Sequence, residues 1–329
     1  MNRRVHAVLF LFLLGVFFFF GCSKESEDSG EVWESMRLLD FGARPIPSPD
    51  GTKLAFATEE TQNHTAGIYL FTADSIVQLT AGSPPHSWDY FWAPDGEHLA
   101  FSAPGEVGTE MAGIWVIDIE TLELQQVWDR GSAPTWDCED PNVLYCAGPE
   151  DGTDNEGIFV INLEPLMKAR ILEKGTSPKV SPDRHRLAYQ IAGAGSQGRE
   201  LHVVTLNDSA DTLVAYHTGN FAWAWNSELI VYEYLEEGVL DIYSVSILTP
   251  LSPSLLVTEA SLPAPFPGEN RVAFTKLSGA SLAGIWTVAA TGGSAGRLTS
   301  TGTHPQPTSD GATIYFDNED GIYILNRVR

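Results

Sequence analysis

The sequence has few basic residues, few cysteines and, after its first 22 residues, no long apolar run. It carries 19 lysines and arginines against 43 aspartates and glutamates, a net charge of −24 at pH 7. A protein that binds duplex nucleic acid, or anionic lipid through a polybasic segment, would show the opposite balance. No segment after the N-terminal region sustains a helical period, and none there is long enough to span a membrane. These absences exclude a nucleic-acid-binding protein and a protein with several membrane spans.

Signature motifs of metal and nucleotide sites are also missing. The eight histidines form no H-E-x-x-H pattern and no Cys/His zinc spacing. The stretch GAGSQG, residues 193–198, matches G-x-G-x-x-G, but the segment ELHVVTLN that follows it has the pattern of a strand. A dinucleotide site needs a helix there, because the helix N-terminus binds the pyrophosphate. We therefore interpret this stretch as a loop.

The N-terminus has the pattern of an export signal. Arg3 and Arg4 precede an apolar run over residues 7–20, which ends in Gly21-Cys22. This resembles a bacterial lipobox, which implies cleavage before Cys22 and lipidation of that cysteine. The alternatives are an ordinary signal peptide or an uncleaved anchor. We predict a signal peptide over residues 1–21, a flexible polar tether over 22–32 and a lipid-anchored extracytoplasmic protein, on the periplasmic or cell-surface side of a bacterial membrane.

The two remaining cysteines flank a turn at Asp140-Pro141-Asn142. In a simple hairpin Cys138 pairs near Val143, which leaves Cys146 about 10 Å further along the strand, beyond the reach of a disulfide. A buried free thiol is the better interpretation for Cys146, and a bulged hairpin would reverse it.

One motif recurs along the whole chain after the tether. The stretch APDGEHLAF at residues 93–101 has relatives in six other places, and the first apolar residue of each final triplet marks the period. These residues are Leu54, Leu99, Leu144, Leu187, Ile230, Val272 and Ile314, with steps of 45, 45, 43, 43, 42 and 42 residues. Units of this length with alternating apolar residues are typical of four-stranded propeller blades.

Each unit divides into four expected strands, A to D. The Pro-Asp-Gly turn joins A to B, and a Gly-Ile-aromatic segment such as 113–115 forms C. The seventh unit ends after its C strand, while an unmatched strand, residues 36–42, lies at the start. We therefore predict an all-β fold over residues 33–329: a seven-bladed β-propeller of four-stranded blades, closed by an N-terminal strand added to the last blade.

The repeated (Ser/Ala)-Pro-Asp-Gly-x-x-Leu-Ala-Phe pattern, followed by Gly-Ile-aromatic, resembles the TolB-like, WD-like propeller repeat of bacterial extracytoplasmic proteins. The resemblance covers residues 48–329, and it is specific for the fold rather than for a function. In TolB the propeller is six-bladed, follows a separate N-terminal domain and binds a lipoprotein at its channel mouth. Related propellers cap serine peptidases or act as polysaccharide lyases, so the resemblance implies either a binder or an enzyme.

The aspartates of the repeated turn, Asp50, Asp95, Asp183 and Asp310, are expected to be structural. Proline presets φ at the second turn position, aspartate accepts a local backbone N–H, and glycine adopts positive φ. One active site needs its residues once, whereas this turn recurs in several blades.

Two regions are candidate binding surfaces. The link into the second blade is lengthened by an insertion that includes His86, Trp88, Asp89 and Tyr90, which either contact a partner or pack over the channel. The B–C loops carry 14 acids against only Lys276 and Arg199, whereas the A–B side carries nine acids and four bases. Within these loops we single out acids that give a basic partner a docking surface: Asp151, Asp154, Glu156, Glu236 and Glu237.

These features lead to one functional hypothesis and one alternative. We predict a non-catalytic cell-envelope binding module that presents the acidic loop face to a protein or peptide of basic character. No cofactor is expected, although Asp151, Asp154 and Glu156 have the ligand type for Ca²⁺ without the spacing of an EF-hand. The alternative is a channel-mouth enzyme, such as a carbohydrate lyase or hydrolase, that uses His86 and His304 with a bound metal.

Overall fold

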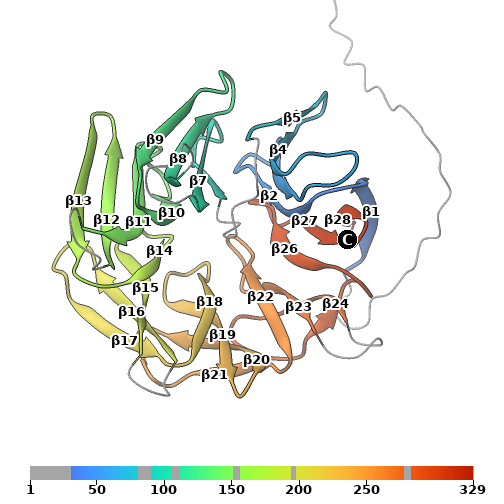
Figure 1. The fold of residues 1–329 in the computed structure, drawn as a ribbon. Coiled ribbons are helices and arrows are strands. Elements are labelled where there is room, and N and C mark those ends of the chain that lie inside the picture. Colours follow the sequence, from blue (N-terminus) through green and yellow to red (C-terminus); the bar gives the residue numbers. More distant parts are fainter. Residues whose placement is uncertain are drawn as a thin grey trace, which may run out of the picture.

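The computed structural model describes residues 31–80, 90–104, 112–150, 156–193, 198–277 and 283–328. These residues contain strands and no helix, so none of them forms a helix that could cross a membrane. The strands make seven four-stranded antiparallel sheets arranged in a ring, which confirms the seven-bladed β-propeller (Figure 1).

The first four blades follow the chain in order, each with its first strand innermost. Blade 1 has β2 (Ala43–Pro47), β3 (Leu54–Thr58), β4 (Gly67–Phe71) and β5 (Ile76–Gln78). Blade 2 has β6 (Tyr90–Trp92), β7 (His98–Pro104), β8 (Ala112–Asp118) and β9 (Leu124–Trp128). Blade 3 has β10 (Ser132–Trp136), β11 (Val143–Pro149), β12 (Glu156–Leu163) and β13 (Leu166–Leu172). Blade 4 has β14 (Thr176–Val180), β15 (Arg186–Ala192), β16 (Arg199–Thr205) and β17 (Asp211–Ala215).

The last three blades include the one built from both ends of the chain. Blade 5 has β18 (Thr218–Trp223), β19 (Leu229–Glu236), β20 (Val239–Ser246) and β21 (Ser254–Val257). Blade 6 has β22 (Ala260–Pro265), β23 (Val272–Lys276), β24 (Gly284–Val288) and β25 (Gly296–Arg297). Blade 7 has β26 (Thr303–Pro307), β27 (Thr313–Asn318) and β28 (Gly321–Arg327), and β1 (Trp33–Leu39) pairs antiparallel with β28 as its outer strand.

The inner wall of the ring is continuous. The first strand of every blade contacts the first strand of the next, and β26 of blade 7 contacts β2 of blade 1. Indole N–H groups add direct links: Trp92 Nε1 donates to Ile46 O, and Trp136 Nε1 to Phe91 O, each at 2.9 Å. The apolar core lies between neighbouring sheets, because each strand presents one set of alternate side chains to the blade before it and the other to the blade after it.

The Pro-Asp-Gly turns have the structural role expected from their chemistry. In blade 1, Asp50 Oδ1 accepts from Thr52 N at 3.1 Å and from Ser48 Oγ at 2.6 Å. Gly51, at φ 71°, takes a conformation that favours glycine. The side-chain bonds from Ser48 and Thr52, which outweigh the opposing effect of burial, lower the pKa of Asp50 to about 2. Asp310 in blade 7 repeats the arrangement with Thr308 and Ala312.

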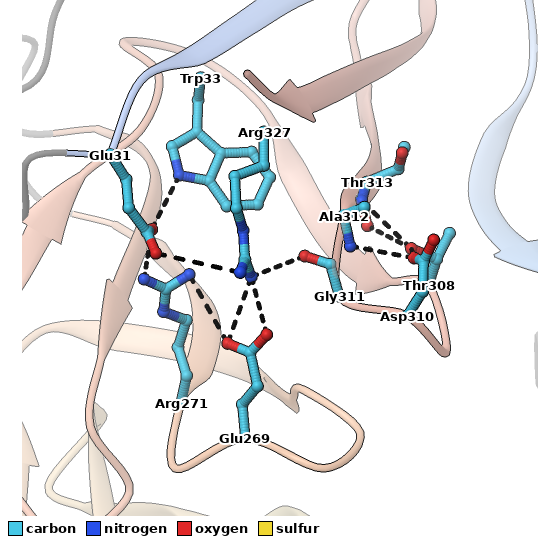
Figure 2. A network of polar contacts seen from close by, with 10 residues as sticks. All are labelled: Glu31, Trp33, Glu269, Arg271, Thr308, Asp310, Gly311, Ala312, Thr313 and Arg327. Carbon is cyan, nitrogen blue, oxygen red and sulfur yellow. Dashed lines mark hydrogen bonds and ion pairs between the residues drawn. The ribbon is translucent and has the colours of Figure 1, made fainter. Parts of the chain in front are cut away.

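The propeller has two ends. We call the end with the turns between first and second strands the A–B face, and the end with the loops between second and third strands the B–C face; the links from one blade to the next also lie at the B–C face. The chain enters β1 at the A–B face, where Trp33 pairs with Arg327. Figure 2 shows the polar network that holds this point: Glu31 bonds Arg271, and Arg327 Nη2 donates to Glu269 Oε1 at 2.9 Å.

Candidate functional site

A cavity of about 900 Å³ lies against the inner wall on one side of the ring. Its walls come from three inner strands, β10, β14 and β18, with Phe91 of β6 at one edge. At the B–C face it reaches Gly193, Gly198 and Leu235, and toward the A–B face it reaches Pro182. Ligand sites in proteins have this size.

Charged groups line the cavity on blades 4 and 5. Lys179 of β14 and Arg199 of β16 supply positive charge, and Glu233 of β19 is the one acid among the described lining residues. The Arg199 guanidinium donates to Gln190 Oε1 at 3.3 Å. Gln190 is itself fixed, because its amide Nε2 donates to Gly219 O at 2.6 Å. The arginine is therefore held at the rim by a side chain that is hydrogen-bonded to the next blade.

Glu233 is an internal carboxylate rather than a surface acid. It is 4 % exposed, and three donors occupy its oxygens: Asn220 N and Asn220 Nδ2, each at 2.9 Å, and Leu262 N at 2.7 Å. Leu262 belongs to blade 6 and has φ 55°. The carboxylate thus ties blade 5 to blade 6 by satisfying a backbone N–H that the inner strand leaves unpaired. Gly219 is required beside it, because an added Cβ would lie 2.7 Å from Glu233 Oε2.

Asp317 has the same role at the junction of blades 7 and 1. It is 3 % exposed and accepts from Arg44 N at 2.6 Å, from Thr303 Oγ1 at 2.5 Å and from His304 Nδ1 at 2.9 Å. Burial disfavours its charged form, but the hydrogen bond and charge of His304, with the bonds from Thr303 and Arg44, outweigh that effect and lower its pKa. The predicted channel-mouth residue His304 is therefore paired with a buried acid of its own blade.

The structure shows that only some of the acids expected in the B–C loops are exposed at the B–C face. Two of the 14 acids expected in the B–C loops are Glu233 and Asp317, yet both are buried in strands and bonded to a neighbouring blade. Other acids of the set are exposed at the B–C face: Glu59, Glu60, Glu150, Glu156, Glu236, Glu237, Glu319 and Asp320. Asp151 and Asp154 lie outside the described residues, as do Glu106 and Glu110. In the described part of the chain no three His, Cys, Asp or Glu residues gather as a metal site, so the Ca²⁺ prediction at 151–156 stays a prediction.

The insertion before blade 2 is described only at its last residue. His86, Trp88 and Asp89 lie outside the described residues, and so does Cys22. Tyr90 begins β6 and is 1 % exposed, and its hydroxyl donates to Arg44 O of blade 1. Tyr90 is therefore buried between blades 1 and 2, so it neither packs over the channel nor is exposed to a partner in this structure.

Both described cysteines are free. Cys146 is fully buried in β11 between blades, and burial raises the pKa of its thiol. Cys138 lies in the turn before β11, where its Sγ faces Ser181 O at 3.6 Å. Cys138 is exposed as a residue, but partial desolvation of its sulfur, with the nearby charge of Asp137, raises its pKa to about 11. The register differs by one residue from the predicted hairpin, because Asp137 rather than Cys138 bonds Val143, and the two cysteines are not bridged.

The hairpin tip between β19 and β20 carries two of the exposed acids of the B–C face. Glu236 pairs with Val239, so Glu237 and Gly238 form a two-residue turn. Both have positive φ, 52° and 84°, as a type I′ turn requires. Asparagine and glycine are favoured there, whereas glutamate is not. Within the described residues the Glu237 carboxylate has no hydrogen-bond or ion-pair partner, and Leu235 and Val239 beside it are about half exposed.

The fold defines the chain as a seven-bladed β-propeller, and comparisons with known proteins agree at that level. No protein-family model matches the sequence, and no curated protein matches it. Solved structures do match. An oligogalacturonate lyase in complex with manganese has a TM-score of 0.64 and 16 % identity over 94 % of this chain and 97 % of its own. The oligogalacturonate lyase of Vibrio parahaemolyticus gives 0.62, with 14 % identity over 93 % and 97 %.

A TolB structure is also among the neighbours. TolB from Acinetobacter baumannii has a TM-score of 0.50 and 12 % identity, over 89 % of this chain and 65 % of that one. The structural neighbours thus include TolB and other β-propellers. At these identities the likeness shows the fold alone.

Proposed function

We propose that the protein is a non-catalytic binding module of the cell envelope that presents its B–C face to a protein or peptide of basic character. The observation that carries this is Glu237. A glutamate at the first central position of a type I′ turn costs about 1–2 kcal/mol relative to a residue that accepts the left-handed conformation. Nothing in the described structure compensates that cost, since the carboxylate has no partner there. Other described residues, such as Leu122, Leu251 and Glu259, also adopt positive φ, but the tip adds a second exposed acid, Glu236, directly beside Glu237.

The surroundings of the tip fit a peptide partner. Glu236 and Glu237 place two carboxylates at a two-residue turn between paired strands, with exposed Leu235 and Val239 on either side. Charge attracts and orients a basic segment, and exposed apolar side chains supply contact area. The hairpin is ordered by its own strand pairing, so binding does not have to order it.

The proposal is tested by capture from an envelope extract of the source organism. The bait carries Cys22→Ser in place of the predicted lipid site, and it is compared with the double variant E236Q/E237N. A matched control, E120Q/E123Q, removes two exposed acids from the turn between β8 and β9 at the A–B face. We expect wild type and control to recover the same protein, released by salt, and E236Q/E237N to lose it. Equal recovery by all three baits would contradict the proposal.

Stability separates this function from a purely structural turn. Because asparagine accepts positive φ more easily than glutamate, E237N is expected to raise the free energy of unfolding by about 0.5–1 kcal/mol while it weakens capture. A purely structural role predicts no loss of capture.

A further inference from the structure

A smaller cavity, of about 280 Å³, lies between blades 4 and 5 next to the hairpin tip. We call it the aromatic pocket, because rings make up most of its wall. The described residues that form this wall include Tyr216 and His217 after β17, Tyr232 and Tyr234 of β19, and Leu251 and Pro253 before β21. Leu251 N donates to Val214 O of β17 at 2.9 Å, so the segment before β21 is tied to blade 4 beside the pocket.

The rings form one packed cluster around Tyr234. The centroid of its ring lies 5.3 Å from that of His217 and 5.0 Å from that of Tyr243, and the Tyr243 ring lies 6.1 Å from that of Tyr232. Alternate residues of a strand share one face, so Tyr232, Tyr234 and Glu236 of β19 all lie on the side of blade 5 that packs on blade 4. The pocket therefore presents the faces of several aromatic rings, to which a cation is attracted.

The groups beside these rings carry negative charge. The Tyr234 hydroxyl donates to Glu236 Oε2 at 2.9 Å, and Asp241 is the cross-strand partner of Tyr234. Burial raises the pKa of Tyr234, and the hydrogen bond to Glu236 and the charge of Asp241 raise it further, so its hydroxyl stays neutral at pH 7. The described lining residues include no lysine and no arginine. Rings and carboxylates together make this a favourable place for a positive charge.

Tyr232 adds an unpaired polar group to the wall. The residue is 1 % exposed and lines the pocket, yet its hydroxyl has no hydrogen-bond partner within the described part of the chain. Buried polar groups in native proteins are normally bonded to protein, water or a ligand. The Tyr232 hydroxyl is thus an acceptor for an N–H group of a molecule that fills the pocket.

We propose that the aromatic pocket binds the side chain of an arginine. The arginine belongs to the basic partner of the hairpin tip, so this inference rests on the function proposed above. Its guanidinium lies against the Tyr234 ring and donates to the Glu236 carboxylate, which is bonded to the same tyrosine. Arginine suits the pocket better than lysine, because its planar head stacks on rings, donates directed N–H bonds and is more weakly hydrated. The volume is below that of sites for drug-sized ligands and fits one side chain.

Titration of the Cys22→Ser protein with acetyl-Gly-Arg-Gly-amide, followed by saturation-transfer NMR of the peptide, tests both the charge and the shape of the head group. The citrulline peptide is nearly isosteric and neutral, whereas the lysine peptide keeps the charge on a different head. We expect saturable binding of the arginine peptide. Binding should be at least about tenfold weaker for the citrulline peptide and about threefold weaker for the lysine peptide.

Variants of the wall test the location. Tyr234→Leu removes the central ring and should weaken the arginine peptide about tenfold. Tyr232→Phe removes only a hydroxyl and should weaken it about threefold, and it is expected to fold even where Tyr234→Leu does not. Tyr323→Leu is the matched control, because the Tyr323 hydroxyl also bonds an exposed acid, Asp320 at 3.0 Å, but in blade 7 and away from the pocket. It should bind the peptide like wild type.

Three results would each overturn the proposal: equal affinity for the arginine and citrulline peptides, no saturable binding at millimolar concentration, or equal losses in Tyr234→Leu and Tyr323→Leu. Tighter binding of the lysine peptide would contradict the choice of arginine.

The variant E237N separates this inference from the proposed function. It leaves Glu236 and the rings in place, so it should keep the affinity for the arginine peptide within about twofold while it weakens capture from the extract. Loss of capture by E236Q/E237N without any preference for the arginine peptide would refute the pocket alone. A preference for the arginine peptide with equal capture by all baits would refute the proposed partner alone.

Discussion

Asp317→Asn is expected to weaken the junction between the last and the first blade. The aspartate accepts three hydrogen bonds, from Arg44 N, Thr303 Oγ1 and His304 Nδ1, in a place that is 3 % exposed. Asparagine keeps one acceptor oxygen but replaces the other with an NH₂ group that faces donors. Hydrogen bonds to a buried charge contribute about 1.5–3 kcal/mol each, and leaving partners unpaired costs a similar amount. We expect a loss of about 3 kcal/mol and a fall in Tm of roughly 6–10 °C.

The same substitution makes a prediction about pH. Because the pKa of Asp317 is lowered in the folded protein, its contribution is complete above the unfolded value of about 4 and is lost as pH falls through the folded pKa. The difference in unfolding free energy between wild type and Asp317→Asn, measured by urea denaturation, should therefore shrink below about pH 4.

Asp320→Asn is the control for this prediction. Asp320 is an acid of the same blade, 55 % exposed, with an ion pair to Arg37 at 3.6 Å, and its loss should cost under about 1 kcal/mol. A cost for Asp317→Asn as small as that of the control, or a difference from wild type that stays constant from pH 7 to pH 3, would refute the reasoning.

Two further predictions concern the thiols and the start of the propeller. In the Cys22→Ser protein without reductant, the buried Cys146 should react with a thiol reagent only after unfolding. The exposed Cys138 should react in the folded protein, but slowly at pH 8, because its thiol pKa is raised to about 11. Absence of free thiols after unfolding would show a disulfide instead. Arg327→Met removes the bonds to Glu269 Oε1 and to Gly311 O, at 2.9 and 2.7 Å, and should cost about 1–3 kcal/mol. Amide hydrogen exchange should then accelerate first in β1, and unchanged protection of that strand would count against the network as its anchor.

The blades could be predicted from the sequence because their signals are local. Each Pro-Asp-Gly turn fixes its own geometry through bonds that span two or three residues, such as Thr52 N to Asp50, so the repeat is visible without knowledge of the ring. Alternation along the first residues of β27 likewise reports burial directly, whereas β3 is buried at every residue.

The cavity could not be predicted in this way. Its walls combine Lys179, Phe221 and Phe91, which lie more than 40 residues apart and meet only because the ring places β6, β14 and β18 around one space. The size of a gap between strands depends on how side chains pack, and the periodicity of one strand does not contain that information.

Glu233 and Asp317 show where the sequence analysis went wrong and which signal it overlooked. Glu233 follows Tyr232 and Asp317 follows Phe316, each the aromatic residue of the second strand of its blade. We expected a loop to begin at this position, but β19 and β27 continue past it. In other blades this position also reaches the next inner strand: Ser102 Oγ accepts from Ala133 N at 3.0 Å, and Gln190 donates to Thr218 O at 3.2 Å. Aligning that single position across the repeats would have indicated a contact between blades.

The polar network around Glu31 fixes the point at which the chain joins the propeller. Glu31 and Trp33 are held at the A–B face by Arg271 and Arg327 (Figure 2). Eight residues lie between Cys22 and Glu31, so the nine steps from one to the other span at most about 30 Å when fully extended. A lipid at Cys22, as the sequence predicts, would attach the propeller to the bilayer from its A–B face, the end opposite the hairpin tip of Glu237. The B–C face, which carries the proposed binding surface, would then stay accessible to a partner from another layer of the envelope.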